Sequence, residues 1–175
     1  MLHDFNLLIT TTRGCETHAC SETWYLLSQI GDPDPKTDKA GISGLITAQT
    51  SFQPQEAVEK LRTLLKERPR DFHFTLRVIP IQRVTHTDLH EIEQAATQLA
   101  QQIQRDETFR VTVEKRFTNT STEDIIEAAA RNIENRVSLT NPDKILLIEV
   151  VGRLTGLSIL KPADIMSTAK ERTET

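Results

Sequence analysis

The sequence is poor in the residues on which several classes of protein depend. Among 175 residues there are six glycines, two cysteines, one tryptophan and one tyrosine. So few glycines leave little room for a glycine-rich loop that cradles phosphate, and neither a P-loop nor a dinucleotide-binding motif occurs. Two cysteines cannot build a disulfide framework, so we expect a reducing compartment, the cytoplasm.

Long apolar runs and an excess of positive charge are also missing. No run approaches the roughly 18 residues of a membrane helix, and the N-terminus has no signal-peptide pattern, so we expect no membrane contact. Lysine and arginine together number 21 against 25 acidic residues, a formal net charge of −4. A dedicated cationic coat for nucleic acid is therefore excluded, and any contact with phosphate must come from a local patch.

Apolar periodicity predicts strands and helices that alternate along the chain. Period-two or buried runs predict strands at 5–11, 42–48, 72–84, 109–113, 144–151 and 157–160, and helical spacing predicts helices at 15–30, 54–65, 89–103 and 121–133. Alternation of this kind favours an α/β (α+β) fold of small mixed sheets covered by helices. We expect domains at 1–85 and 86–166, followed by a frayed tail at 167–175.

Cys15, His18 and Cys20 have a spacing that suggests a metal or redox site. On a helix, residues five apart lie about 140° from each other, and no second Cys/His group supplies four ligands. We therefore expect no metal and no cofactor. No nucleophile motif occurs, and the pair Glu123 and Asp124 is explained by favourable charge at a helix start. We expect no catalytic residue and no enzyme, with a small enzyme using a buried acid, base or thiol as the alternative.

Charge is unevenly distributed between two neighbouring segments. Residues 60–83 carry seven cations and two anions, a net charge of +5, whereas residues 84–99 carry a net charge of −3. The contrast fits either a binding surface or two solvated faces. The cations taken as candidates for a binding surface are Arg68, Arg70, Arg77 and Arg83.

A second cationic group lies where the strand at 109–113 gives way to a helix. Strand alternation predicts that Arg110 and Arg116 share the face opposite the valines, while Lys115 has the parity of the valines but lies at the strand end. Cations, hydroxyls and free backbone N–H groups then gather at one junction, as in a phosphate-binding corner or in an ordinary capped helix. The candidate residues are Arg110, Lys115, Arg116, Thr118, Asn119 and Ser121.

Several motifs occur in order over residues 109–161. Phe109–Arg116 is followed by the helix at 124–130, by the element Val137–Asp143 that ends in Asn-Pro-Asp, and by strands at 148–150 and 157–161. This series resembles the THUMP domain family. Phe5 to Thr12, with the Arg-Gly-Cys-Glu that follows, is similar to the start of the ferredoxin-like domain that precedes THUMP.

The resemblance implies an RNA-binding protein that holds the acceptor stem and 3′ CCA end of tRNA. Because no catalytic domain follows, the chain resembles the stand-alone group that assists a separate acetyltransferase in forming N4-acetylcytidine in tRNA. Arg110, Lys115 and Arg116 would then hold phosphates, and Lys161 and the 68–83 region would extend the track. Three alternatives stay open: an adaptor for tRNA thiolation or methylation, a small ferredoxin-like enzyme, and a homodimer or other assembly paired through an exposed sheet edge.

Overall fold

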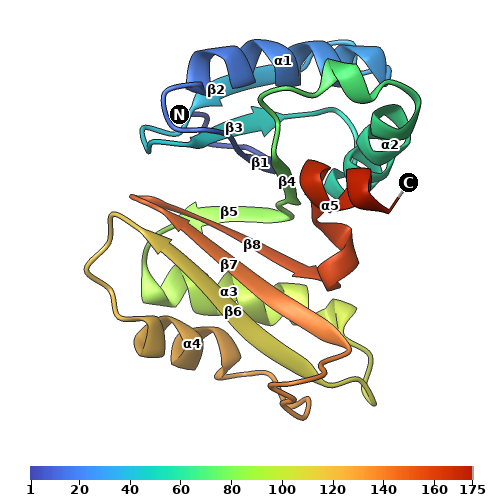
Figure 1. Cartoon of the computed structure of the whole chain (residues 1–175). Helices are drawn as coiled ribbons and strands as arrows, with labels where there is room; N and C mark the ends of the chain where they lie inside the picture. The colour runs from blue at the N-terminus through green and yellow to red at the C-terminus, as the bar shows by residue number, and fades with distance from the viewer. Residues whose placement is uncertain (175) are drawn as a thin grey trace. The chain divides into compact units, whose positions relative to one another are not determined.

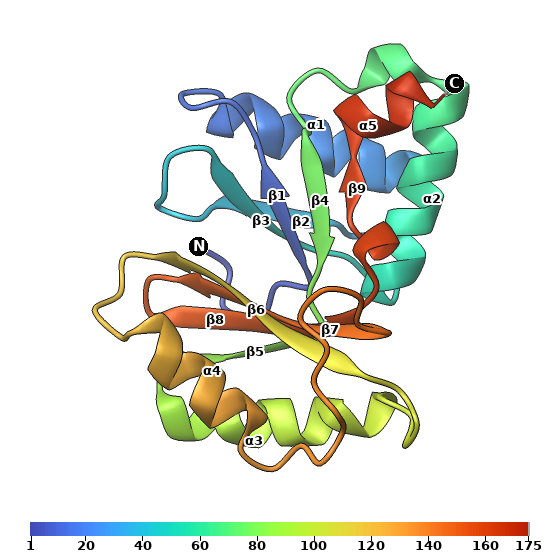
Figure 2. The same cartoon turned by 60° about the horizontal axis from the view of Figure 1, so that its bottom comes forward.

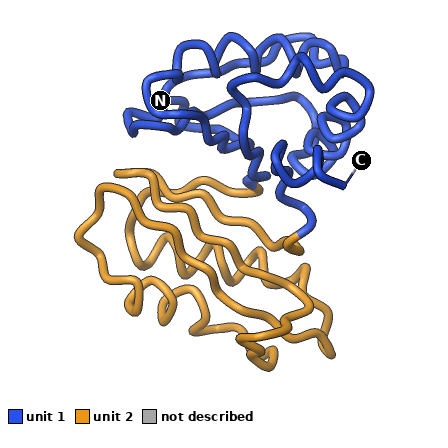
Figure 3. The backbone as a smooth tube through the Cα atoms, viewed as in Figure 1, with its two compact units in different colours: residues 1–81, 163–175 blue, residues 82–162 orange. Residues whose placement is uncertain are grey.

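The computed structural model describes residues 1–174, which form two compact units (Figure 3). Unit 1 comprises Met1–Ile81 together with the segment that begins at Ala163, and unit 2 comprises Gln82–Pro162. Within the described residues, no helix is both long and apolar enough to cross a membrane. The chain therefore leaves unit 1, builds unit 2 and returns.

Unit 1 is built on a five-stranded sheet in the order β2-β3-β1-β4-β9, with every neighbouring pair antiparallel. The strands are β1 (Leu7–Thr10), β2 (Lys36–Lys39), β3 (Leu45–Gln49), β4 (Arg77–Pro80) and β9 (Met166–Ser167). The helices are α1 (Glu16–Gln29), α2 (Pro54–Glu67) and α5 (Thr168–Thr173), with one 3₁₀ turn at Pro69–Asp71. Without β9 and α5, the order β1-α1-β2-β3-α2-β4 is the ferredoxin-like arrangement.

The core of unit 1 lies between this sheet and helices α1 and α2. Strand pairing places Ile9 beside Ile46 and Val78, so these side chains share one face. Leu27 of α1 and Leu61 of α2 are buried in the same cluster. The helical spacing of apolar residues in the sequence marks these faces, because only a stripe of that spacing can cover a sheet continuously.

Residues 168–173 form helix α5, which corrects the prediction of a frayed tail there; residue 175 of the predicted tail lies outside the described residues. Met166 and Ser167 pair with Val78 and Arg77 at the edge of the unit 1 sheet, and α5 follows directly (Figure 2). The Met166 side chain is fully buried in the core. The Thr168 backbone N–H donates to the Leu76 carbonyl at 2.9 Å. A single buried apolar residue with backbone pairing thus anchors a segment whose composition is polar.

The strand predicted at 72–84 is two strands that belong to different sheets. β4 covers Arg77–Pro80 in unit 1, and β5 (Arg83–His86) belongs to unit 2. Before β4, the Glu22 carboxylate accepts hydrogen bonds from the backbone N–H groups of His73, Phe74 and Thr75. Those donors are satisfied by a side chain rather than by a sheet ladder, so the strand begins later than apolar alternation predicts.

Unit 2 has a four-stranded sheet in the order β5-β8-β7-β6. Its other strands are β6 (Phe109–Arg116), β7 (Lys144–Val151) and β8 (Leu154–Leu160), and its helices are α3 (Leu89–Leu99) and α4 (Thr122–Ala130). Short 3₁₀ turns lie at Ala100–Gln102 and Pro162–Asp164. β6 and β7 are parallel, whereas β8 is antiparallel to both β7 and β5. The predicted mixed sheets covered by helices are therefore confirmed.

Both helices of unit 2 lie on one face of this sheet (Figure 1). Ile148 of β7 and Leu157 of β8 pack in one buried cluster with Ile92 of α3 and Ile125 of α4. α4 begins as predicted, because the Ser121 hydroxyl accepts a hydrogen bond from the Asp124 backbone N–H at 3.0 Å. Such a cap typically stabilises a helix by about 1 kcal/mol. It also fixes the connection between β6 and α4.

Candidate nucleic-acid interface

The connection between β6 and α4 gathers polar groups at the end of a strand. The Lys115 ammonium donates to the Thr120 carbonyl at 3.0 Å. The Thr118 hydroxyl accepts from the Thr120 backbone N–H at 3.2 Å, and Ser121 caps α4. Asn119 is an exposed residue of the same loop. The structure thus brings Lys115, Thr118, Asn119 and Ser121 into one corner, as the sequence predicts.

Arg110 and Arg116 lie on the opposite face of β6 from Lys115. The register pairs Lys115 with Val150, whose side chain is in the core below α3 and α4, whereas Arg110 pairs with Ile145 and Arg116 with Val151. In parallel pairing at equal register, paired residues point to the same face. Alternation therefore predicts the two faces correctly. The three cations therefore start from two faces of the sheet, and a phosphate corner formed by all three stays a prediction.

The guanidinium of Arg116 already has an anionic partner inside the protein. Its Nη1 lies 2.6 Å from Oε2 of Glu149, a carboxylate whose side chain is only 3% exposed. Arg110 donates from Nη1 to the Leu139 carbonyl at 3.0 Å, and its buried Nε has no hydrogen-bond partner in the described structure. Both arginines thus hold neighbouring segments of unit 2 in place. Of the three cations, only Lys115 has an exposed side chain. Within residues 1–174 it forms no ion pair with a carboxylate, unlike Arg116.

The remaining predicted cations are divided between the two units. Arg68, Arg70 and Arg77 belong to unit 1, whereas Arg83 and Lys161 belong to unit 2. Arg68 forms an ion pair with Asp71, its Nε lying 2.8 Å from Oδ2, and also contacts Tyr25. The other four are exposed. A continuous cationic track through all five remains a prediction.

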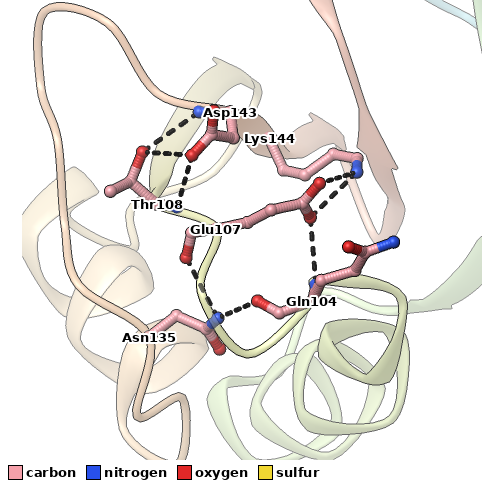
Figure 4. A network of polar contacts seen from close by, with 6 residues as sticks. All are labelled: Gln104, Glu107, Thr108, Asn135, Asp143 and Lys144. Atoms are coloured by element: carbon pink, nitrogen blue, oxygen red, sulfur yellow. Dashed lines mark hydrogen bonds and ion pairs between the residues drawn. The ribbon is translucent and has the colours of Figure 1, made fainter.

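A network of polar contacts fixes the loop that enters β7, next to the start of β6 (Figure 4). The Asp143 carboxylate accepts from the backbone N–H of Thr108 at 2.8 Å and from its hydroxyl at 3.0 Å. Glu107 accepts from the Lys144 ammonium at 2.9 Å, and Asn135 donates to the Glu107 carbonyl at 3.1 Å. The Asn-Pro-Asp element therefore holds β6 and β7 in register through its aspartate. Turn chemistry alone predicts the loop but not these partners.

Acid is expected to weaken this network. The Thr108 backbone N–H, followed by its hydroxyl, holds the pKa of Asp143 below its usual 3.8, and the hydrogen bond from Lys144 holds the pKa of Glu107 below its usual 4.5. A carboxylate with a lowered pKa in the folded state contributes stability that is complete above the unfolded value and is lost as the pH falls through the folded one. The loss is therefore expected below about pH 5.

Urea unfolding of the wild type and Asp143→Asn checks this expectation. The substitution should lower the midpoint near neutral pH, because the uncharged amide accepts the same hydrogen bonds more weakly. The difference between the two proteins should shrink as the pH falls below 3.8, the usual pKa of Asp143, because the carboxyl is then protonated in the unfolded chain. A difference that is constant with pH would contradict the assignment.

The predicted absence of a metal site stays a prediction, but the residues that suggested one have other contacts. Cys15 is the residue before α1, and the His18 ring stacks on Phe74 with centroids 5.0 Å apart. The Cys20 carbonyl accepts from the Thr37 hydroxyl, and burial raises the pKa of the Cys20 thiol. Across residues 1–174 no group of three or more His, Cys, Asp or Glu side chains is placed to hold a metal ion.

Sequence reasoning missed Phe117 as a surface feature. Its side chain is 80% exposed, the largest fraction among the large apolar side chains of the described residues. Its φ is +55°, and no other non-glycine residue in the described part of the chain has a positive φ. Apolar residues are expected to be buried, so alternation gives no signal for a ring that the backbone directs into solvent.

The middle of the chain matches a known domain family. Residues 86–160 match the model of the THUMP domain. This segment is a THUMP domain. It includes all of β6, α4, β7 and β8, and with them the Lys115 corner. The resemblance inferred from the order of the motifs is therefore confirmed for unit 2.

One curated relative and several solved structures resemble longer parts of the chain. Uncharacterized protein MJ0421 of Methanocaldococcus jannaschii is 32% identical over 101 residues, which cover 55% of this chain and 28% of that protein. PH1313 of Pyrococcus horikoshii superposes with a TM-score of 0.67 at 16% identity, covering 90% of this chain and 54% of that one.

Two further solved structures share the fold over most of this chain. A 4-thiouridine synthetase in complex with RNA and ATP has a TM-score of 0.55 at 13% identity, covering 94% of this chain and 42% of that one. TrmN of Thermus thermophilus has a TM-score of 0.53 at 16% identity, covering 89% and 45%. These likenesses extend over the THUMP domain and unit 1 together and show a shared fold. The chain spans about half or less of the length of these proteins.

Proposed function

We propose that the protein binds tRNA at its acceptor end through the THUMP domain and presents it to a separate tRNA-modifying enzyme. The THUMP match over residues 86–160 carries this proposal. A solved structure that shares the fold over 94% of this chain is a 4-thiouridine synthetase bound to RNA, which supports RNA as the ligand class. In this proposal the protein acts in the cytoplasm, has no catalytic chemistry of its own, and assists N4-acetylcytidine formation.

The Lys115 corner would hold the RNA backbone. An ammonium that is exposed, and whose hydrogen bond goes to a carbonyl rather than to a carboxylate, keeps its full charge for a phosphate. The hydroxyls of Thr118 and Ser121 and the amide of Asn119 lie in the same loop and can add polar contacts. Phosphate contacts position RNA without reading its sequence, so recognition would rest on the shape and the unpaired end of the acceptor stem.

Titration of the protein with intact tRNA, and with tRNA trimmed of its 3′ end, tests the proposal. Binding that is lost on trimming would support recognition of the acceptor end, and absence of binding to either RNA would refute the proposal. The acetylation role is tested separately, by adding the protein to a tRNA acetyltransferase and measuring N4-acetylcytidine. Stimulation of thiolation or methylation instead would assign the adaptor to another modification.

Lys115→Ala is expected to weaken tRNA binding without unfolding the protein. Loss of one phosphate contact should flatten the slope of log affinity against log salt by about 0.7 to 0.9. The matched control is Lys36→Ala, an exposed lysine on β2 in unit 1. Filter-binding titrations over a range of salt concentrations measure both slopes. An unchanged slope for Lys115→Ala, or an equal change for the control, would remove Lys115 from the interface.

A further inference from the structure

Phe117 combines an unfavourable backbone conformation with an exposed aromatic ring. A bulky side chain at φ +55° is a genuine outlier, because its Cβ crowds the backbone in the left-handed region. The ring is also 80% exposed, so it gains little from burial. Glycine would remove the backbone cost, asparagine would reduce it, and either would avoid exposing an apolar ring. A residue that is strained and solvated in the free protein points to an interaction made with another molecule.

The backbone on both sides of Phe117 is held firmly. The Gly152 N–H donates to the Arg116 carbonyl at 2.9 Å, and the ion pair between Arg116 and Glu149 anchors the same residue. On the other side, the Thr120 carbonyl accepts from Lys115, and the Thr120 N–H donates to the Thr118 hydroxyl. The ring is thus presented from a preorganised turn rather than from a loose loop, which lowers the entropic cost of binding.

The surroundings of the ring favour a nucleobase over a protein surface. Phe117 lies between two cations in the sequence before it and four polar residues after it, from Thr118 to Ser121. Protein docking surfaces need a contiguous apolar patch, whereas an exposed ring with a lysine and hydroxyl residues next to it in the sequence is typical of stacking sites for unpaired bases. Lys115, which is exposed and lies two residues before Phe117, supplies a cation for a phosphate next to a stacked base.

We propose that Phe117 is a stacking platform for an unpaired base of the bound RNA. The inference rests on the proposed function and adds to it a base contact that requires a single-stranded segment. Stacking on an aromatic side chain tolerates any base, because every base has a flat face. The protein would therefore distinguish a single-stranded end from a duplex at this position, and not one base sequence from another.

The proposal is tested by measuring the binding of two hairpin RNAs. One has a single-stranded 3′ end that contains the fluorescent base 2-aminopurine, and the other is the same hairpin with a blunt end. The wild type should bind the tailed hairpin more tightly and quench its fluorescence. Phe117→Ala should lose about tenfold in affinity for the tailed hairpin and little for the blunt one. Phe117→Tyr should retain wild-type binding and quenching. The matched control is Leu139→Ala, an apolar side chain in the same unit that is 70% exposed, and it should bind as the wild type does.

The outcomes separate this inference from the function on which it rests. If the wild type binds neither hairpin, the proposed function fails, and this inference fails with it. If the wild type prefers the tailed hairpin but Phe117→Ala binds and quenches equally, only the stacking proposal is overturned. If Phe117→Ala retains RNA binding and loses the modifying enzyme instead, the ring contacts protein and the proposal is also overturned. Circular dichroism of each variant establishes that it is folded.

Discussion

A chain that ends at Pro162 is expected to lose the stable fold of unit 1. Met166 is fully buried there, and replacing a buried methionine by alanine alone costs about 2 to 5 kcal/mol. The truncation also removes the ion pair between Arg62 and Glu171 at 2.8 Å and the hydrogen bond from Arg172 to the Pro69 carbonyl at 3.0 Å. The combined loss is comparable to the roughly 5 to 15 kcal/mol that stabilises a typical domain.

Trp24 makes this expectation measurable for unit 1 alone. It is the one tryptophan of the sequence and lies in α1. Its fluorescence in urea should show a large decrease in the unfolding midpoint for the truncated chain and a smaller decrease for Met166→Ala. Lys170→Ala, at an exposed position of α5, is the control and should leave the midpoint unchanged. An unaltered midpoint in the truncated chain would mean that β9 and α5 add nothing to the stability of unit 1.

Arg116→Ala is expected to destabilise unit 2 by about 3 kcal/mol. The substitution removes the guanidinium 2.6 Å from the Glu149 carboxylate, which is 3% exposed and costly to keep charged without that partner. Arg116→Ala combined with Glu149→Gln should recover part of the loss, because the variant no longer buries a full negative charge. Two residues that act independently would instead show additive losses in this double-mutant cycle.

The ion pair between Arg116 and Glu149 also determines which substitutions can be used to assign phosphate contacts. A combined Lys115→Ala and Arg116→Ala variant would weaken RNA binding partly by unfolding unit 2, so its affinity could not be assigned to phosphate contacts. Circular dichroism in urea measures the stability of each single variant. Lys115→Ala should unfold at the wild-type midpoint, whereas Arg116→Ala should not. An Arg116→Ala variant of wild-type stability and reduced RNA affinity would support the predicted phosphate contact of Arg116.

Local patterns predict the helices and central strands well because those elements depend on periodic burial. β7 covers Lys144–Val151, the range that its apolar run predicts, and Ser121 caps α4 as its residue type predicts. The passage from β4 to β5 is not predicted, because both strands continue one apolar alternation while the chain changes sheets near Ile81. Alternation reports burial and carries no information about the partner strand.

The candidate site is predicted only in part for a related reason. The β6–α4 corner is local in sequence, so its hydroxyls and Lys115 could be grouped without a structure. The partner of Arg116 is Glu149, which lies 33 positions later on a neighbouring strand, and a carboxylate in the middle of an apolar strand does not reveal which cation it contacts. The exposure of Phe117 depends on a backbone angle that no residue pattern around it indicates.

The discontinuous make-up of unit 1 has a consequence for the order of events on the ribosome. Every residue of the THUMP-containing unit is synthesised before Met166, which completes the core of the first sheet. Domains that emerge as continuous segments generally fold as units during synthesis. Unit 2 is thus expected to fold first, although unit 1 begins earlier in the sequence. Unit 1 stays incomplete, with apolar surface exposed to aggregation, until β9 leaves the ribosomal exit tunnel.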